Sequence, residues 1–192
     1  MYRTYPESAI MPGFYCDFAS GDPWHGPYHD REYGFPIRDD RRLFERLMLE
    51  VNQAGLSWLT ILKKKAAFHE AYDGFDPAIV ARYGARDIRR LMGNAGIIRN
   101  RLKIEAAIAN ARRILELQES HGSFRRWLDQ HHPRSKGDWV ALFKKTFRFT
   151  GGEIVGEFLL STGYLPGAHR SDCPVYGRIL RLKPPWTRDG GS

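Results

Sequence analysis

The chain has 192 residues, of which 42% are hydrophobic, and this is enough apolar material for one sizeable domain whose core needs no disulfides. Thirty Lys and Arg against 22 Asp and Glu leave a formal net charge of +8, which favours a polyanionic partner, with nucleic acid as the first candidate. The apolar runs are too short to span a membrane, and the N-terminus lacks the apolar block of a secretory signal, so we expect a cytoplasmic protein.

Helical spacing dominates the chain after an N-terminal arm. Glycines, prolines and aromatic residues alternate through residues 1–38, which predicts an ordered but irregular arm. Apolar residues then recur every three or four positions, and the alternation typical of strands is scarce. The predicted helices cover about 40–51, 57–68, 76–83, 87–92, 99–115, 124–129, 139–147 and 153–161. We therefore predict an all-α fold, with a single domain over residues 1–182 and a disordered tail over 183–192.

One acidic residue falls on an apolar helix face. Glu50 follows Leu43 and Leu47 at helical spacing, so its carboxylate shares their stripe. A carboxylate is rarely buried without a partner, because removing it from water costs several kcal/mol. Two interpretations stay open: Glu50 is paired with an arginine at a helix end, or it faces a pocket.

The segment after Glu50 favours a pocket. In the run Gln53-Ala54-Gly55-Leu56-Ser57-Trp58, the glycine ends one helix, the serine caps the next, and an indole lies at the junction. Such a set can hold a flat heterocycle, with the ring stacked on Trp58 and Glu50 accepting its hydrogen bonds. Trp58 taken alone is typical of core packing.

A glycine-containing hairpin precedes the longest predicted helix. Its backbone N–H groups and the start of that helix could hold a phosphate. The candidate phosphate contacts are Gly96, Ile97, Arg99, Arg101 and Lys103. A plain helix turn with a solvated charge run is the alternative.

Two cysteines and two histidines are candidate metal ligands. His169 and Cys173 are four positions apart, so one helical turn would aim both side chains at a common point, and Cys16 and His29 would complete a Cys₂His₂ set. The paired C-x₂-C spacing of common zinc sites is absent, so two buried thiols with unrelated histidines remain an alternative.

Together, four segments resemble the DNA-3-methyladenine glycosylases of type I, in the helix-hairpin-helix glycosylase superfamily. They are residues 28–34 (Tyr-His-Asp-Arg-Glu-Tyr-Gly), Leu49-Glu50 with 53–64, 94–101 leading into Lys103, and His169 with Cys173. The resemblance extends from about Cys16 to Cys173.

The resemblance implies an all-α helix-hairpin-helix fold in which a structural zinc ion joins the arm to the C-terminal region. The implied zinc ligands are Cys16, His29, His169 and Cys173. It also implies that Glu50 and Tyr28 hydrogen-bond a base extruded from DNA and that Trp58 stacks on this base.

The activity implied by the resemblance is hydrolysis of an N-glycosidic bond. A monofunctional glycosylase would remove N3-alkylated adenine, namely 3-methyladenine, or a related alkylated base from double-stranded DNA in base excision repair. We expect a monomer. The alternative is a nucleic-acid-binding helix-hairpin-helix module with structural zinc that is non-catalytic or differently specific.

The chain departs from the family pattern near the expected pocket. Tyr33 stands where the family often has tryptophan, and Glu157 stands near a position where the family usually has a small hydroxyl residue. If Glu157 reaches the pocket, it would contact the base and raise the pKa of one of two neighbouring carboxyls. The alternative is that Glu153 and Glu157 form a solvated pair on one helix.

Overall fold

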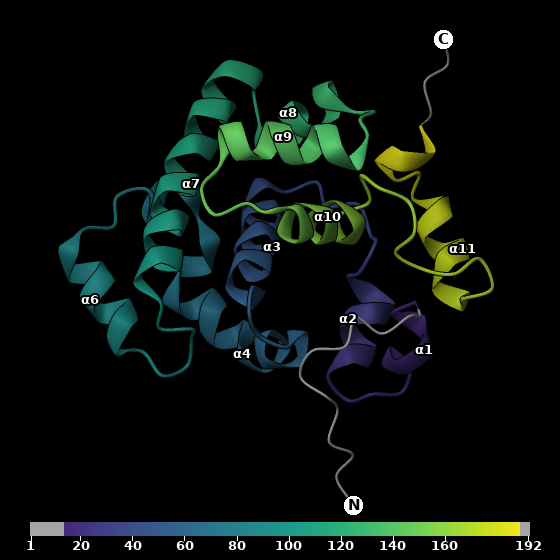
Figure 1. Ribbon diagram of the computed structural model, residues 1–192, viewed down its shortest axis with the longest axis horizontal. Helices are drawn as coiled ribbons and strands as arrows, with labels where there is room; N and C mark the ends of the chain where they lie inside the picture. The colour runs from purple at the N-terminus through teal and green to yellow at the C-terminus, as the bar shows by residue number, and fades with distance from the viewer. Residues whose placement is uncertain (1–13, 189–192) are drawn as a thin grey trace, which may run out of the picture.

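The computed structural model describes residues 14–188, and every regular element in this range is helical, as predicted (Figure 1). The helices are α1 (Cys16–Ala19), α2 (His25–Arg31), α3 (Asp40–Gln53), α4 (Trp58–Ala71), α5 (Pro77–Val80), α6 (Ala85–Gly93), α7 (Arg101–His121), α8 (Phe124–His131), α9 (Lys136–Thr146), α10 (Gly152–Ser161) and α11 (Pro174–Arg181), with short 3₁₀ helices η1 (Asp73–Phe75) and η2 (Pro185–Thr187). None of the helices in the described range combines the length and apolar character that a membrane span requires.

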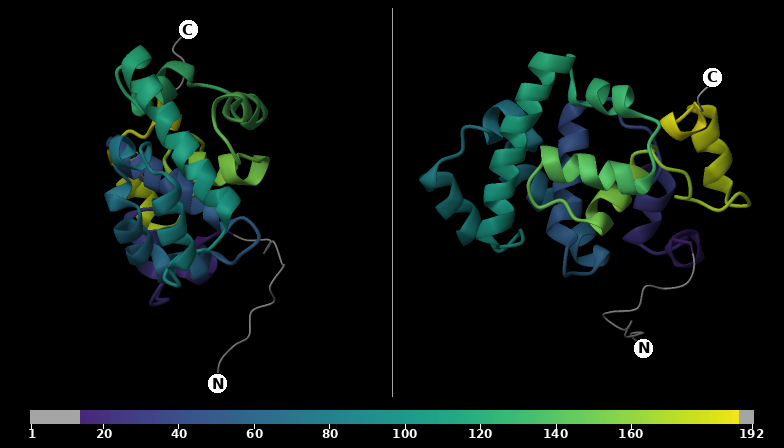
Figure 2. Two further views of the ribbon diagram at one scale, coloured as in Figure 1. Left: turned by 90° about the vertical axis from the view of Figure 1, so that its left-hand side faces the viewer. Right: turned by 45° about the horizontal axis from the view of Figure 1, so that its top comes forward.

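Helix α3 lies at the centre of the molecule. The Asp39 side chain caps it by accepting a hydrogen bond from the backbone N–H of Arg42 at 2.9 Å. Leu43, Phe44 and Leu47 on this helix are fully buried. Helices α4, α7, α8 and α10 pack around it (Figures 1 and 2). Side chains near the end of α3 are therefore held from several directions.

The two ends of the described chain meet on one side of α3. Figure 1 shows α1 and α2 beside α11, although more than a hundred residues separate them in sequence. The backbone N–H of Gly34 donates to the Ser161 carbonyl at 2.9 Å, which joins the arm to the end of α10. The arm and the C-terminal region thus form one wall next to the C-terminal half of α3.

The arm and the tail are more regular than their composition suggests. Helices α1 and α2 lie within the predicted irregular arm, and α11 was not predicted at all. The backbone N–H of Trp186 in η2 donates to the Gly163 carbonyl at 3.1 Å, so the prediction of disorder is wrong for residues 183–188. Residues 1–13 of the arm and 189–192 of the tail lie outside the described range, and the single domain over 1–182 stays a prediction.

Candidate active site and metal centre

Four aromatic rings gather where the arm meets α4. Tyr28 lies on α2, Tyr33 follows that helix, and Trp58 is the first residue of α4. The Tyr28 ring centroid lies 5.1 Å from that of Trp58 and 5.7 Å from that of Tyr33, and Tyr15 lies 5.0 Å from Tyr33. The Trp58 indole N–H is buried and has no partner within residues 14–188. The cluster therefore combines flat apolar faces with an unused hydrogen-bond donor.

Glu50 lies in the last turn of α3 and is only 4% exposed. Its carboxylate makes no hydrogen bond or ion pair within the described residues. Burial raises the pKa of the Glu50 carboxyl to about 8, against the opposing positive charge of Arg46 and with a further rise from the negative charge of Glu157. In the free protein at neutral pH, Glu50 therefore carries a proton for much of the time.

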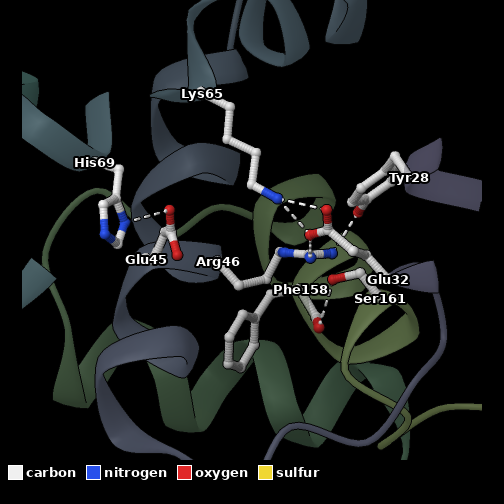
Figure 3. A network of polar contacts seen from close by, with 8 residues as sticks. All are labelled: Tyr28, Glu32, Glu45, Arg46, Lys65, His69, Phe158 and Ser161. Atoms are coloured by element: carbon white, nitrogen blue, oxygen red, sulfur yellow. Dashed lines mark hydrogen bonds and ion pairs between the residues drawn. The ribbon is translucent and has the colours of Figure 1, made fainter. Parts of the chain in front are cut away.

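An arginine does lie one turn before Glu50, but it bonds to other groups (Figure 3). The guanidinium of Arg46 donates from Nη1 to the Tyr28 hydroxyl at 2.5 Å and from Nη2 to Glu32 Oε2 at 3.0 Å. Lys65 on α4 donates to both oxygens of Glu32. The interpretation that Glu50 is locked to an arginine partner is therefore wrong, and Glu50 keeps its acceptor oxygens free.

Glu157 on α10 faces the aromatic cluster. The Tyr33 hydroxyl donates to Glu157 Oε2 at 3.2 Å. Loss of water around the carboxyl raises the pKa of Glu157, the Tyr33 hydrogen bond opposes this rise, and Glu153 adds to it. Glu153 itself is 90% exposed and lies 3.8 Å from Lys136 Nζ. The two acids thus have different surroundings, and the one at position 157 lies near the pocket.

A hollow of about 380 Å³ opens beside the cluster. Tyr15 and Tyr33 line it together with Phe14, Gly167 and Ala168. Glu50 does not line this hollow. The hollow therefore borders the tyrosine side of the cluster.

The four candidate metal ligands converge. Ligand atoms of Cys16, His29, His169 and Cys173 all lie within 4.8 Å of one another, and all except Cys16 are buried. Cys173 Sγ lies 3.7 Å from His29 Nε2 and 3.6 Å from His169 Nδ1, and Cys16 Sγ lies 3.4 Å from His169 Nδ1. Such separations suit a tetrahedral ion with ligand bonds of about 2.0–2.3 Å.

The outer hydrogen bonds of the two histidines prepare them for a metal. His29 Nδ1 is 2.7 Å from Asp30 Oδ1, and His169 Nε2 is 2.8 Å from the Tyr33 carbonyl. Carboxylate and carbonyl oxygens only accept, so these two nitrogens carry the hydrogens. The opposite ring nitrogens then present lone pairs to the two thiols, and the residues present fit a closed metal site.

The backbone conformation that brings His169 and Cys173 together differs from the prediction. His169 and Cys173 lie in a turn before α11, with Cys173 at the N-cap of that helix, and they do not share a helical turn. The predicted common point is confirmed, whereas the helical geometry invoked for it is wrong.

The hairpin joins α6 to α7 and is anchored to the core. Ile97 is 3% exposed, and Lys64 Nζ donates to the Ala95 carbonyl at 2.8 Å. Gly96 lies against α4, and its backbone N–H already donates to Asn94 Oδ1 at 2.8 Å. The Gly96 amide therefore has an acceptor within the hairpin and the Ile97 side chain anchors the hairpin to the core, while the phosphate contacts of these two residues stay predictions.

The basic residues of the hairpin divide into two kinds. Arg99 and Arg101 are exposed, and Arg101 forms a 3.4 Å ion pair with Glu105. Lys103 is 5% exposed, and its Nζ donates to the carbonyls of Asn52 at 2.9 Å and Ala54 at 2.7 Å. Its ammonium binds the end of α3 and so supports the fold, and the phosphate contact of Lys103 stays a prediction.

Sequence reasoning missed the charged network behind Tyr28. Arg46 precedes Glu50 by one helical turn and follows Leu43 by three positions. This spacing places Arg46 on the apolar face of the predicted helix and could have identified it as a buried residue. Glu32 and Lys65 gave no such signal, because their partners are distant in sequence.

Within the described residues, a helical fold with a buried acid near a cluster of tilted aromatic rings defines a protein that can enclose a flat heterocycle. The sequence model described as methyladenine glycosylase matches residues 18–139. The chain belongs to the methyladenine glycosylase family.

Two curated relatives are DNA-3-methyladenine glycosylases. That of Escherichia coli, DNA-3-methyladenine glycosylase 1, is 37% identical and covers 84% of this chain and 96% of its own. That of Haemophilus influenzae is also 37% identical and covers 79% of this chain and 95% of its own.

Solved structures agree with this assignment. The 3-methyladenine DNA glycosylase I of Staphylococcus aureus superimposes with a TM-score of 0.76 at 37% identity, covering 84% of this chain and 95% of that one. A tyrosine-to-phenylalanine variant of a 3-methyladenine DNA glycosylase I in complex with 3-methyladenine gives a TM-score of 0.75 at 36% identity, covering 84% and 96%.

Proposed function

We propose that this chain is a monofunctional DNA glycosylase that hydrolyses the N-glycosidic bond of 3-methyladenine, or a related N3-alkylated adenine, in double-stranded DNA. The observation that carries the proposal is the buried, unbonded carboxyl of Glu50 near Tyr28, whose ring lies 5.1 Å from that of Trp58. A group that is expensive to bury and has no internal partner is available to a ligand that enters the site.

Each pocket residue makes a different contact with the extruded base. Trp58 supplies a stacking face, and Tyr28 and Glu50 supply hydrogen bonds to the base edge. An N3-alkylated adenine is cationic in the nucleoside, and its positive charge favours ionised Glu50 and so lowers the pKa of this group. Tyr33 lines the open hollow beside the pocket, and Glu157 accepts the hydrogen bond of the Tyr33 hydroxyl.

Little further catalysis is needed once the base is held. Attack of a water oxygen on the sugar C1′ forms one bond while the C1′–N9 bond breaks, and the electron pair of that bond neutralises the positive ring. The proton lost by the attacking water passes to solvent. Glu50 acts by stabilising the extruded cation and does not need to protonate the leaving base.

We also propose that zinc occupies the Cys16, His29, His169 and Cys173 cluster. The thiol and imidazole donor set and the close spacing of its ligand atoms support zinc among the common metals. Because the protein fills all four positions, the ion would be structural and would supply no site for a reacting water.

For DNA binding we retain Arg99 and Arg101 as phosphate contacts on a helix-hairpin-helix element. Their exposure, next to the N-terminus of α7, supports this role. We propose that the protein acts as a monomer in the cytoplasm, where it meets DNA.

A differently specific or non-catalytic DNA-binding protein is the second candidate. The observation that favours it is Glu157, whose carboxylate bonds Tyr33 beside the pocket. A second acid there would favour a base with more donors or more positive charge.

Release of free 3-methyladenine from methylated duplex DNA tests the proposal. We expect release by the wild type, and a loss of about 100-fold or more with Glu50→Gln, since the carboxylate charge is the element that opposes the cation. Glu70→Gln, on an exposed position of α4, is the matched control and should keep wild-type activity. A folded wild type that binds DNA without releasing 3-methyladenine would support the second candidate.

A further inference from the structure

We propose that Arg46 is a positioning residue of the base pocket, which holds the Tyr28 hydroxyl as a donor toward the base and keeps a positive charge one helical turn from Glu50. The inference rests on the proposed function, because it concerns the pocket assigned there to the alkylated base. It adds a residue that contacts neither the base nor the sugar.

The burial of Arg46 demands a reason. Its side chain is 4% exposed, on the mostly apolar face of α3 that also carries Glu50. Taking a guanidinium out of water is costly unless its donors are used. Two of these donors reach Tyr28 and Glu32, and the guanidinium carbon lies 4.7 Å from the centroid of the Tyr28 ring. Figure 3 shows the arginine directed at both partners from α3.

The bond to Tyr28 sets the direction of a proton. An arginine can only donate, so the Tyr28 oxygen accepts, and the hydroxyl proton must point away from Arg46. Within residues 14–188 no group accepts the proton of this hydroxyl. Its proton is therefore available to an acceptor on a bound base. Without Arg46 the hydroxyl could rotate and serve either as donor or as acceptor.

The same arginine supplies the cation that acts on Glu50. The ionisable groups that face this carboxyl come from the arm, α2, α3 and α10, and they are Tyr15, Tyr28, Tyr33, Arg46 and Glu157. The tyrosines are neutral near pH 7 and Glu157 opposes ionisation. Arg46 is therefore what favours the charged form of Glu50.

Glu32 and Lys65 keep this cation in place. Glu32 accepts a hydrogen bond from one nitrogen of Arg46. Without a further cation, the negative charge of Glu32 would cancel the positive charge of Arg46. Lys65 binds the same carboxylate, so the three groups together remain net positive. The network fixes the arginine and still leaves a positive charge one turn from Glu50.

Three variants separate positioning from simple structural support. Arg46→Met keeps a long side chain and removes the charge and both donors. Arg46→Lys keeps the charge and loses the two-pronged donor geometry. Arg42→Met removes an exposed charge from the same helix and is the matched control.

The first measurement follows Glu50 by carbon-13 NMR of labelled glutamate, with the signal assigned by its loss in Glu50→Gln. Since an opposite charge shifts a pKa by one unit or more, we expect the pKa of Glu50 to rise from about 8 to about 9 or higher in Arg46→Met. Arg46→Lys and Arg42→Met should stay close to the wild type. This readout needs no substrate, so it decides the role of Arg46 even if the wild type releases no 3-methyladenine.

The second measurement is the Kd of free 3-methyladenine, read from tryptophan fluorescence at pH 7. Loss of an oriented donor should weaken binding about tenfold in both Arg46 variants and leave Arg42→Met unchanged. An Arg46→Met protein with a lower Tm but an unaltered Glu50 titration and Kd would overturn the proposal and leave Arg46 a structural residue. If Arg46→Met does not fold, Arg46→Lys decides both claims. A wild-type Kd in Arg46→Lys would overturn the claim about Tyr28. A changed pKa of Glu50 in Arg46→Lys would overturn the claim about charge.

Discussion

The carboxyl of Glu50 makes the stability of the folded chain depend on pH. Its pKa is about 8 in the folded protein and near 4.5 when exposed, so between these values the folded chain holds a proton that the unfolded chain has released. The unfolded state is then favoured as the pH rises. The stability contribution of Glu50 is fullest below about pH 4.5, falls between about 4.5 and 8, and is lost above this window.

Replacing Glu50 by glutamine should therefore stabilise the protein while it removes activity. We expect the Tm of Glu50→Gln to exceed that of the wild type by roughly 5–10 °C at pH 8 and to match it near pH 4.5. Thermal unfolding at several pH values checks this, with Glu70→Gln as the control. A difference in Tm that does not change with pH would contradict the raised pKa.

Glu157 should act on the same group in the opposite direction to Arg46. Glu157→Gln keeps an acceptor for the Tyr33 hydroxyl and removes the negative charge, so the pKa of Glu50 should fall. The rise of kcat/KM with pH should then move to lower pH by about half a unit. The control is Glu153→Gln, on the same helix but in solvent. A shift to higher pH, or an equal shift in the control, would show that Glu157 does not face Glu50.

At the level of elements, spacing predicts the long helices and fails where partners are distant. The apolar periodicity and the Ser57 cap placed α3 and α4 correctly, because these signals are local. Helices α1, α2 and α11 have at most eight residues, and their packing comes from contacts between the two ends of the chain. The Pro174 at the start of α11 was the one local signal that could have revealed it.

Lys103 illustrates how a basic residue in a charge run can serve the fold. Its ammonium binds two carbonyls at the end of α3, where backbone acceptors lack helical partners. We expect Lys103→Met to lower the free energy of unfolding by about 2–3 kcal/mol, since bonds from a charged donor are lost in a buried place. Denaturant titration measures this change.

Arg99→Ala supplies the contrast for that measurement. It should leave stability unchanged and reduce the slope of log K against log salt for duplex DNA by about 1, because an exposed phosphate contact is removed. Lys103→Met should keep the wild-type slope. A smaller slope in Lys103→Met together with a wild-type slope in Arg99→Ala would contradict this assignment and make Lys103 the phosphate contact.

At the scale of the whole molecule, the cysteine and histidine cluster joins segments that are 153 positions apart. The candidate site could be predicted in part from sequence: the residues Glu50, Tyr28 and Trp58 lie together, and so do the four ligands. The partners of Arg46 and the contacts of Lys103 could not be predicted, because they depend on how helices distant in sequence pack.

The proposed zinc ion should stabilise the whole chain, because it connects the arm to the C-terminal region that flanks the pocket. We expect about one equivalent of zinc per chain in the wild type, and its loss together with a lower Tm in Cys173→Ser. Since the arm carries Tyr28 and Tyr33, binding of 3-methyladenine should weaken in the same variant. Elemental analysis and thermal unfolding check these points, with His69→Gln, an exposed histidine away from the cluster, as the control. A folded wild type with no bound metal, whose Tm is unaffected by a chelator, would leave two buried thiols as the correct interpretation.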